Sequence, residues 1–170
     1  MPGHYYDISF HLAESRYLQM LFLDTTPLIS DYRAGGRYEN TNVLRADASA
    51  QLRWLEETLL RSAATYRIVI GHHPIASSSP FHGDSPDLES RLMPLFRRYG
   101  VNLYLCGHEH DLQHLLWGGI HHAVCGAGAE CRETGWDMRT LYAASKLCFG
   151  AISVNRAGML HAFFDTDGER

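Results

Sequence analysis

Two apolar runs of this chain each end in a glycine followed by a histidine. Residues 67–73 read RIVIGHH, and residues 103–110 read LYLCGHEH. Short apolar runs that end at glycine are typical of buried strands in a parallel sheet. In open α/β sheets, ligand sites gather at the carboxyl ends of such strands. The pattern therefore places two histidine-bearing loops at one edge of a sheet, where glycine lets the backbone turn without a crowding Cβ.

The segments around these runs alternate between strand and helix patterns, which is typical of βαβ units. Leucines recur at helical spacing in two stretches, and Ser85 followed by Pro86 is a typical start for the second helix. We expect strands at 16–23, 66–70 and 101–106, helices at 50–64 and from 86 to about 99, and hairpins that turn at Gly118-Gly119 and at 155–158.

The remaining stretches are rich in polar residues, glycine and proline. We expect a long loop at 24–42 and an irregular surface segment at 129–146. The predicted fold is α/β, with a mixed sheet, flanking helices and C-terminal β-hairpins. A single domain over residues 1–170 suits this length.

Composition argues against two classes of partner. Fifteen Lys and Arg against nineteen Asp and Glu give a formal net charge of −4, and no basic run occurs. We therefore expect no nucleic-acid binding and no binding to anionic membranes. No stretch reaches the roughly 18 apolar residues of a membrane span, and the first residues do not resemble a signal peptide. The expected location of the chain as given is cytoplasmic.

The four cysteines, Cys106, Cys125, Cys131 and Cys148, form no Cys-x-x-Cys pair. Cys106 and Cys125 lie in apolar runs, where we expect small buried thiols. Spacing alone leaves a disulfide open.

The histidines near the two strand ends are candidate metal ligands. His108 and His110 are two residues apart, so they share a side in an extended segment but diverge in a turning loop, where they can serve two neighbouring ions. Imidazole suits zinc, iron and similar ions. Exposed loop histidines would produce the same short motif, but Gly-His-His-Pro at the end of the preceding strand favours a metal site.

The motifs GHHPI and CGHEHDLQ resemble the last two metal-binding blocks of the calcineurin-like metallophosphoesterases. The chain is most similar to the purple, or tartrate-resistant, acid phosphatase branch of that family. LFLDTTPL resembles its central strand, QLRWLEETL its helix, CGAGAE its Ser-Gly-Ala-Gly loop and FGAISVNRAGMLHAFFDTDGE its closing strand pair. The similarity extends over nearly the whole chain.

The resemblance implies a metal-dependent phosphoesterase. In this family two metal ions, roughly 3.5 Å apart, clamp a phosphate ester that is hydrolysed by metal-activated water. Carried onto this chain, His72 and His108 would bind one ion and His110 the other. His82 would contact the phosphate and protonate the leaving alcohol, although its spacing from the motif is one residue longer than in the family. The resemblance implies Zn, Fe or Mn as the ions, and it disfavours iron(III) because the tyrosine that gives the family's iron its colour is not matched.

We expect the other polar residues to play supporting roles or no chemical role. His73 is expected to support a neighbouring ligand, and His114 either to do the same or to lie on a strand surface. Glu109 and Asp111 are expected to be solvated loop charges, and Asp24 to bond the backbone of its turn. No chemical role is expected for the remaining histidines, His4, His11, His121, His122 and His161.

The resemblance begins after the blocks that supply the family's other ligands, which are two aspartates, a tyrosine and an asparagine of its N-terminal half. The bridging aspartate holds two cations close together. We therefore expect the site to need either a missing N-terminal half or a second copy of the chain in a homodimer. In such a dimer Glu109, Asp111 or Asp24 would be recruited as ligands.

Three hypotheses follow. The first is a phosphoesterase that hydrolyses phosphate monoesters, or also diesters. The second is a non-catalytic remnant that keeps the fold and binds at most one metal. The third is a mononuclear hydrolase with three histidine ligands, since catalytic zinc often has three protein ligands and an open position.

Overall fold

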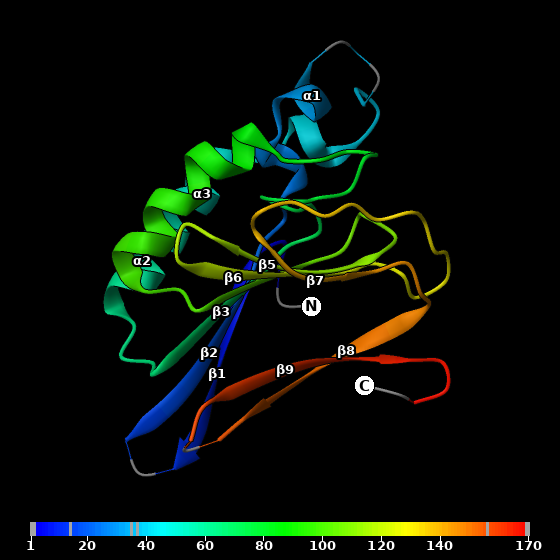
Figure 1. The fold of residues 1–170 in the computed structure, drawn as a ribbon. Coiled ribbons are helices and arrows are strands. Elements are labelled where there is room, and N and C mark those ends of the chain that lie inside the picture. The colour runs from blue at the N-terminus through cyan, green and yellow to red at the C-terminus, as the bar shows by residue number, and fades with distance from the viewer. Residues whose placement is uncertain (1–2, 14, 35, 37, 156, 169–170) are drawn as a thin grey trace.

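The fold is a seven-stranded mixed sheet with two helices on one face and a separate β-hairpin on the other (Figure 1). The computed structural model describes residues 3–13, 15–34, 36, 38–155 and 157–168. The strand order of the sheet is β1-β2-β3-β4-β6-β5-β7, and β8 pairs only with β9. The predicted α/β fold with a mixed sheet is thus confirmed.

Four neighbouring strands, β2, β3, β4 and β6, run parallel. On one side β1 pairs antiparallel with β2, and on the other side β5 pairs antiparallel with both β6 and β7. The strands are β1 Tyr6–Ala13, β2 Arg16–Phe22, β3 Tyr66–Ile70, β4 Leu103–Cys106, β5 Leu112–Trp117, β6 Ile120–Cys125, β7 Thr140–Ala144, β8 Cys148–Val154 and β9 Met159–Asp165.

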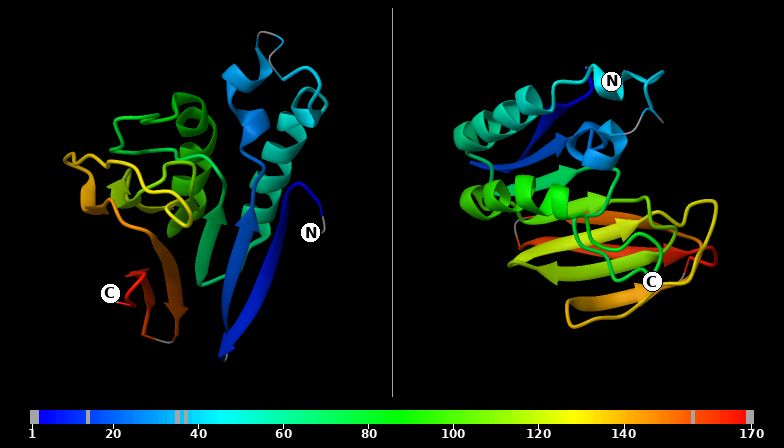
Figure 2. Two further views of the ribbon diagram at one scale, coloured as in Figure 1. Left: turned by 90° about the vertical axis from the view of Figure 1, so that its right-hand side faces the viewer. Right: turned by 90° about the horizontal axis from the view of Figure 1, so that it is seen from above.

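Helices α2 (Ala48–Arg61) and α3 (Pro86–Tyr99) lie side by side on one face of the sheet (Figure 2). Each begins at a side-chain cap. The Asp47 carboxylate accepts a hydrogen bond from Ala50 N at 2.8 Å, and the Ser85 hydroxyl accepts one from Leu88 N at 3.4 Å. Such caps satisfy amide groups that have no partner inside the helix. Because Asp47 provides the cap, α2 begins two residues before the predicted start.

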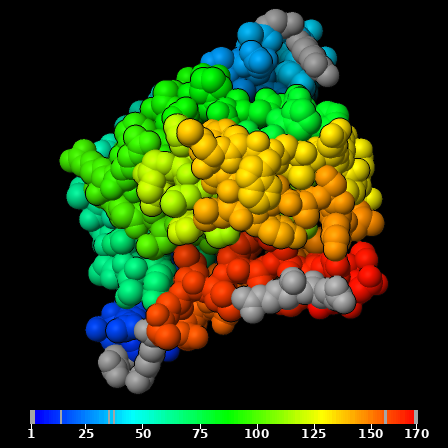
Figure 3. Space-filling view, in the orientation of Figure 1, coloured from blue at the N-terminus to red at the C-terminus, as the bar shows by residue number. Residues whose placement is uncertain are grey.

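Two apolar layers fill the structure. The larger one lies between the helices and the sheet, and among its buried members are Leu21, Leu55, Leu92, Phe96 and Tyr104. The smaller one lies between the sheet and hairpin β8–β9, around Ile68, Leu103 and Ala123, with Ile152, Met159 and Phe163 packed from the hairpin. Figure 3 shows this hairpin as the orange and red band along the lower side.

Most predicted elements are present, with two differences in the segments expected to be irregular. The segment 129–146 contains strand β7, which pairs with β5 at the sheet edge. Its period-two pattern is too short to stand out from the polar residues around it. The loop at 24–42 contains the short helical turns Thr26–Leu28 and Ser30–Arg33, and a third turn, Asn42–Leu44, closes it.

Both predicted hairpins form. Gly118 and Gly119 connect β5 to β6 with φ angles of 60° and 81°, a left-handed conformation that favours glycine. Asn155 N donates to Gly158 O at 3.0 Å at the turn between β8 and β9, although residue 156 of that turn lies outside the described residues. In the described part of the chain, no helix has the length and apolar character needed to cross a bilayer.

The contact between α3 and the sheet gives the first prediction. Leu92 is fully buried in α3, whereas Leu60 in α2 is 66% exposed. We expect Leu92→Ala to lower the free energy of unfolding by about 2–5 kcal/mol, because it leaves a cavity in the larger core. Leu60→Ala, the matched control, should change it by less than about 0.5 kcal/mol. Urea unfolding measures both, and equal effects would contradict this packing.

His122, in β6, gives a prediction about pH. The ring is 0% exposed, and burial lowers the pKa of His122 to about 4 from 6.5. Because the folded-state pKa is the lower one, the unfolded chain binds the proton first as the pH falls. The stability that this histidine contributes is therefore present above pH 6.5 and is lost between about pH 6.5 and 4.

We expect the metal-free protein to lose up to about 3 kcal/mol through His122 over this range. The variant His122→Gln lacks the proton site, so its free energy of unfolding should fall less between the same pH values. Urea titrations of both proteins at several pH values make the comparison. If the free energy of unfolding falls equally with pH in both proteins, His122 does not cause the loss of stability.

Candidate metal centre

Strands β3 and β4 bring the two predicted histidine loops together. The strands are parallel neighbours, with Ile70 opposite Leu105. Beyond their ends, Gly71 N donates to Leu105 O at 3.0 Å, and Gly107 N donates to His72 O at 3.0 Å. Backbone hydrogen bonds therefore hold both loops in a fixed relation at the carboxyl edge of the sheet, as the sequence predicted.

The backbone at this edge shows why glycine is needed and where strain lies. A Cβ on Gly71 would collide with the Tyr104 hydroxyl and the Thr25 methyl group. His108 has a φ of 67°, in the left-handed region that side chains other than glycine rarely adopt. This conformation costs about 1–2 kcal/mol, and such strain is concentrated at functional sites.

Three imidazole rings form a cluster at this edge. His72, His73 and His108 each offer one nitrogen, and these three atoms lie within 4.8 Å of one another. His108 Nδ1 is 3.2 Å from His72 Nε2. His82 belongs to the same group of rings, with its centroid 4.3 Å from that of His108. The structure thus brings three of the four predicted site residues into contact.

His73 is held by hydrogen bonds through both of its ring nitrogens. Nδ1 lies 2.8 Å from Thr25 Oγ1, and Nε2 lies 2.9 Å from the Tyr32 hydroxyl. Its backbone carbonyl also accepts a hydrogen bond from the Tyr104 hydroxyl at 2.7 Å. Both ring nitrogens of His73 are thus engaged in hydrogen bonds, an arrangement consistent with the supporting role that the sequence indicated.

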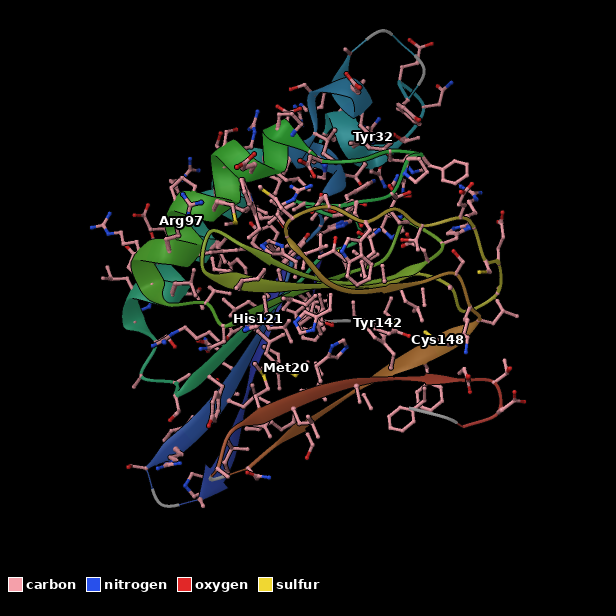
Figure 4. All side chains as sticks on the ribbon, viewed as in Figure 1. Met20, Tyr32, Arg97, His121, Tyr142 and Cys148 are labelled. Carbon is pink, nitrogen blue, oxygen red and sulfur yellow. The ribbon has the colours of Figure 1, made fainter. Side chains whose placement is uncertain are left out.

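Thr25 and Tyr32 were not expected to contribute to the site. Thr25 Oγ1 accepts hydrogen bonds from the backbone amides of His72 at 3.3 Å and His73 at 3.2 Å. Tyr32 (labelled in Figure 4) reaches His73 from the short helix α1, Ser30–Arg33. Both residues belong to the segment predicted as a loop, which carries no periodic signal that would reveal their contacts.

The surroundings of the cluster favour the uncharged form of its three imidazole rings. Burial lowers the pKa of His108 to about 4 and that of His73 to about 3, and the neighbouring histidines add to the effect. The pKa of His72 is also lowered, first by burial and then by the nearby charge of His110. Neutral imidazole is the form that binds metal, so these rings are ready to act as ligands at neutral pH.

Glu109 and Asp111 correct the sequence prediction. They were expected to be solvated, but each residue is only 1% exposed. Glu109 accepts hydrogen bonds from Ser79 Oγ at 2.8 Å and from His82 N at 3.1 Å, and its Oε2 lies 3.2 Å from His82 Nδ1.

Asp111 and Asp24 are also engaged within the protein. Asp111 accepts hydrogen bonds from Gln113 Nε2 at 2.8 and 3.0 Å. Asp24 accepts one from Thr26 N at 3.1 Å, which is the turn contact that the sequence predicted. Its other carboxylate oxygen is 3.8 Å from His4 Nδ1.

His110 lies outside the group of three close nitrogens. Its Nδ1 is 2.9 Å from a carboxylate oxygen of Glu130. Arg132 donates to the other oxygen of Glu130 at 3.0 Å, and this hydrogen bond is the main reason that the pKa of Glu130 is lowered. A carboxylate on one imidazole nitrogen orients the ring and leaves the other nitrogen for a ligand. Glu130 was not recognised from the sequence.

A cavity of about 490 Å³ adjoins this edge of the sheet. Asp24 and Tyr32 line it, together with Tyr38 and Arg45. Tyr32 also contacts His73, so the cavity and the histidine cluster share a wall.

The donors of the cluster fit one transition-metal ion better than two. His72 and His108 supply neutral nitrogens at close range. Among the described residues, the group whose ligand atoms lie close enough to share an ion contains histidines alone. Two cations about 4 Å apart repel strongly unless negative charge lies between them. This group of described residues thus offers no carboxylate that could lie between two ions.

Sequence comparisons agree with the resemblance. Residues 13–112 match the family model described as calcineurin-like phosphoesterase. Purple acid phosphatase 4 of Arabidopsis thaliana is 30% identical over 170 residues, which cover 92% of this chain and 49% of the relative. Tartrate-resistant acid phosphatase type 5 of Homo sapiens is 34% identical over 131 residues, covering 75% of this chain and 40% of the relative. The chain thus spans half or less of these relatives.

Solved structures share the fold. The structure described as GAP50, the anchor in the inner membrane complex of Plasmodium, superposes with a TM-score of 0.83 at 22% identity, covering 99% of this chain and 53% of that one. A purple acid phosphatase from yellow lupin, Lupinus luteus, has a TM-score of 0.69 at 16% identity and covers 89% of this chain and 29% of that one. Because the family model matches 13–112 of the 170 residues, the chain belongs to the calcineurin-like phosphoesterase family, with purple acid phosphatases among its relatives.

Proposed function

We propose that this chain is the histidine-bearing part of a metal-dependent phosphoesterase that hydrolyses phosphate monoesters. The observation that carries the proposal is the 3.2 Å approach of His72 and His108 at the ends of two parallel strands. The lowered pKa values of both rings support it. Diesters remain a second substrate class to be tested with the same assay.

His72 and His108 would hold one ion, and His110 would hold the other, with Zn, Fe or Mn as the candidate metals. A bound ion of this kind supplies a Lewis acid and an activated water molecule. The chain's own contribution is to position the ligands. The Gly71 and Gly107 amide contacts fix the two loops, and Glu130 orients His110 at 2.9 Å.

A complete two-metal site needs carboxylate ligands from another polypeptide segment. Glu109 and Asp111 are buried in their own hydrogen bonds, which makes them unsuited to replace the bridging carboxylate without rearrangement. Asp24 follows β2 and lines the cavity, and we propose it as a carboxylate for recruitment. We propose that the missing ligands come from an N-terminal half or from a second copy of this chain in a homodimer.

His82 is the proposed proton donor to the leaving alcohol. Its side chain is 46% exposed and lies against His108, while Nδ1 faces the buried carboxylate of Glu109 at 3.2 Å. A carboxylate behind one nitrogen keeps a proton on that nitrogen and directs the other nitrogen towards a substrate. Glu109 would therefore act as a positioning residue for His82.

Metal binding provides the first test of this proposal. We expect the purified protein to bind Zn²⁺ or Mn²⁺, and His72→Ala to weaken the binding at least tenfold, because removal of a ligand leaves an incomplete site. His108→Asn should do the same, and asparagine tolerates the left-handed backbone at this position. Calorimetry and elemental analysis give affinity and stoichiometry.

The matched control is His121→Ala, which removes an exposed histidine from β6. It should leave the affinity unchanged. Equal metal binding by the wild type and the His72→Ala and His108→Asn variants would contradict the assignment of the ligands. A protein that binds no metal at all would favour the non-catalytic hypothesis.

The role of His82 is tested with esters whose leaving groups differ. We expect His82→Ala to lower kcat for an alkyl phosphate by about 10²–10⁴-fold, because general acid catalysis is lost. The loss for p-nitrophenyl phosphate should be much smaller, since nitrophenolate leaves without a proton. Steady-state kinetics on the active assembly provide the measurement, and similar losses for both esters would argue against proton donation by His82.

The assembly itself is tested by measuring the mass in solution together with turnover of p-nitrophenyl phosphate. A dimer with two metals per site and turnover would support completion by a second copy. A monomer that becomes active only with a separately produced N-terminal half of a related phosphatase would support the other source of carboxylates. A metal-loaded protein that is inactive in both forms would refute the proposed activity.

A further inference from the structure

Two cysteines approach each other where the hairpin β8–β9 meets the main sheet. Cys125 is the last residue of β6, and Cys148 is the first residue of β8. Their Sγ atoms are 3.9 Å apart, and both are free thiols. The pair plays no part in the proposed phosphoesterase chemistry.

The alternation of side chains along each strand places both thiols on facing surfaces. Cys125 lies on the same face of β6 as Ala123, two residues away, and Cys148 lies on the same face of β8 as Ile152. Ala123 and Ile152 belong to the apolar layer between the sheet and the hairpin. Figure 4 labels Cys148 at the start of β8.

Local contacts hold the two cysteines in this arrangement. Cys148 N donates a hydrogen bond to Ala127 O at 3.1 Å, which ties the start of β8 to the loop after β6. Cys125 lies against Gly150, where an added Cβ would be 3.4 Å from Cys125 Sγ. The absence of a side chain at Gly150 leaves room for the Cys125 side chain next to the hairpin.

We propose that Cys125 and Cys148 are an oxidisable pair that forms a disulfide between the main sheet and hairpin β8–β9. The bond requires the sulfur atoms to approach from 3.9 Å to about 2.05 Å. Rotation of the two side chains can supply this change, because the thiols already face each other across the interface. Both residues are partly exposed, so a small oxidant can reach them.

The reaction balances with glutathione disulfide as the oxidant. The thiolate of Cys125 attacks one sulfur of glutathione disulfide, the S–S bond breaks, and one glutathione leaves as a thiolate that takes up a proton. Cys148 then loses its proton and attacks the Cys125 sulfur, which expels the second glutathione. Two protein thiols are oxidised by two electrons, and one glutathione disulfide is reduced to two glutathione molecules.

The order of attack follows from the surroundings of the two thiols. Burial and the neighbouring Cys125 raise the pKa of Cys148 to about 12, so Cys148 is seldom a thiolate. Because the thiolate is the nucleophile in exchange reactions, the raised pKa makes Cys148 a slow first attacker. Cys148 reacts second, when the mixed disulfide already lies beside it.

The cross-link is tested on the full reduced chain treated with glutathione disulfide, followed by mass measurement. We expect the wild type to lose two hydrogen atoms and two of its four titratable thiols. Trypsin should then release residues 99–132 joined to residues 147–156, because Cys148 is the sole cysteine of the second peptide. Cys131→Ser is the matched control and should keep this cross-link.

Cys125→Ser and Cys148→Ser should each lose the cross-link, and the melting temperature of these variants should be the same before and after oxidation. The oxidised wild type should melt at a higher temperature than the reduced form, and dithiothreitol should reverse the difference. The pair would be refuted by a wild type that retains four free thiols or gains only glutathione adducts. A cross-link that persists in Cys125→Ser would likewise assign the bond to another cysteine.

Discussion

The parallel pairing of β3 and β4 is the constraint on which the site depends. It places the ends of both strands at one edge, and two amide hydrogen bonds beyond those ends, Gly71 N to Leu105 O and Gly107 N to His72 O, fix the loops. The imidazoles of His72 and His108 then meet at this edge of the sheet. The strained backbone of His108 is maintained because this framework determines its position.

The sequence predicted the parts of the fold that carry strong periodic signals. Strands β2, β3 and β4, both long helices and both hairpins were anticipated, and the strand ends marked by Gly-His located the histidine cluster. Strand β7 was missed because its five residues gain their strand character from pairing with β5. Such pairing is a tertiary contact, and local pattern does not contain it.

The site was less predictable than the fold for a similar reason. Glu109 was taken as a surface charge because carboxylates are seldom buried, yet Ser79 and His82 supply the hydrogen bonds that make its burial tolerable. Thr25 and Tyr32 reach the cluster from a loop whose path has no periodic signature. Residues that act through long-range hydrogen bonds leave little trace in a single sequence, whereas direct ligands follow recognisable motifs. The metal assignments of His72, His108 and His110 stay predictions.

The bond between Tyr32 and His73 has a thermodynamic consequence for the segment that carries it. Because the phenol is 2.9 Å from Nε2 of a ring that packs against His72 and His108, the order of this segment and the geometry of the cluster share one interaction energy. Linkage between binding sites is reciprocal. If an ion at the cluster raises the affinity of the segment for a molecule, that molecule raises the affinity of the cluster for the ion by the same factor. Binding at the strand ends should therefore change the order of Tyr32, which lines the cavity.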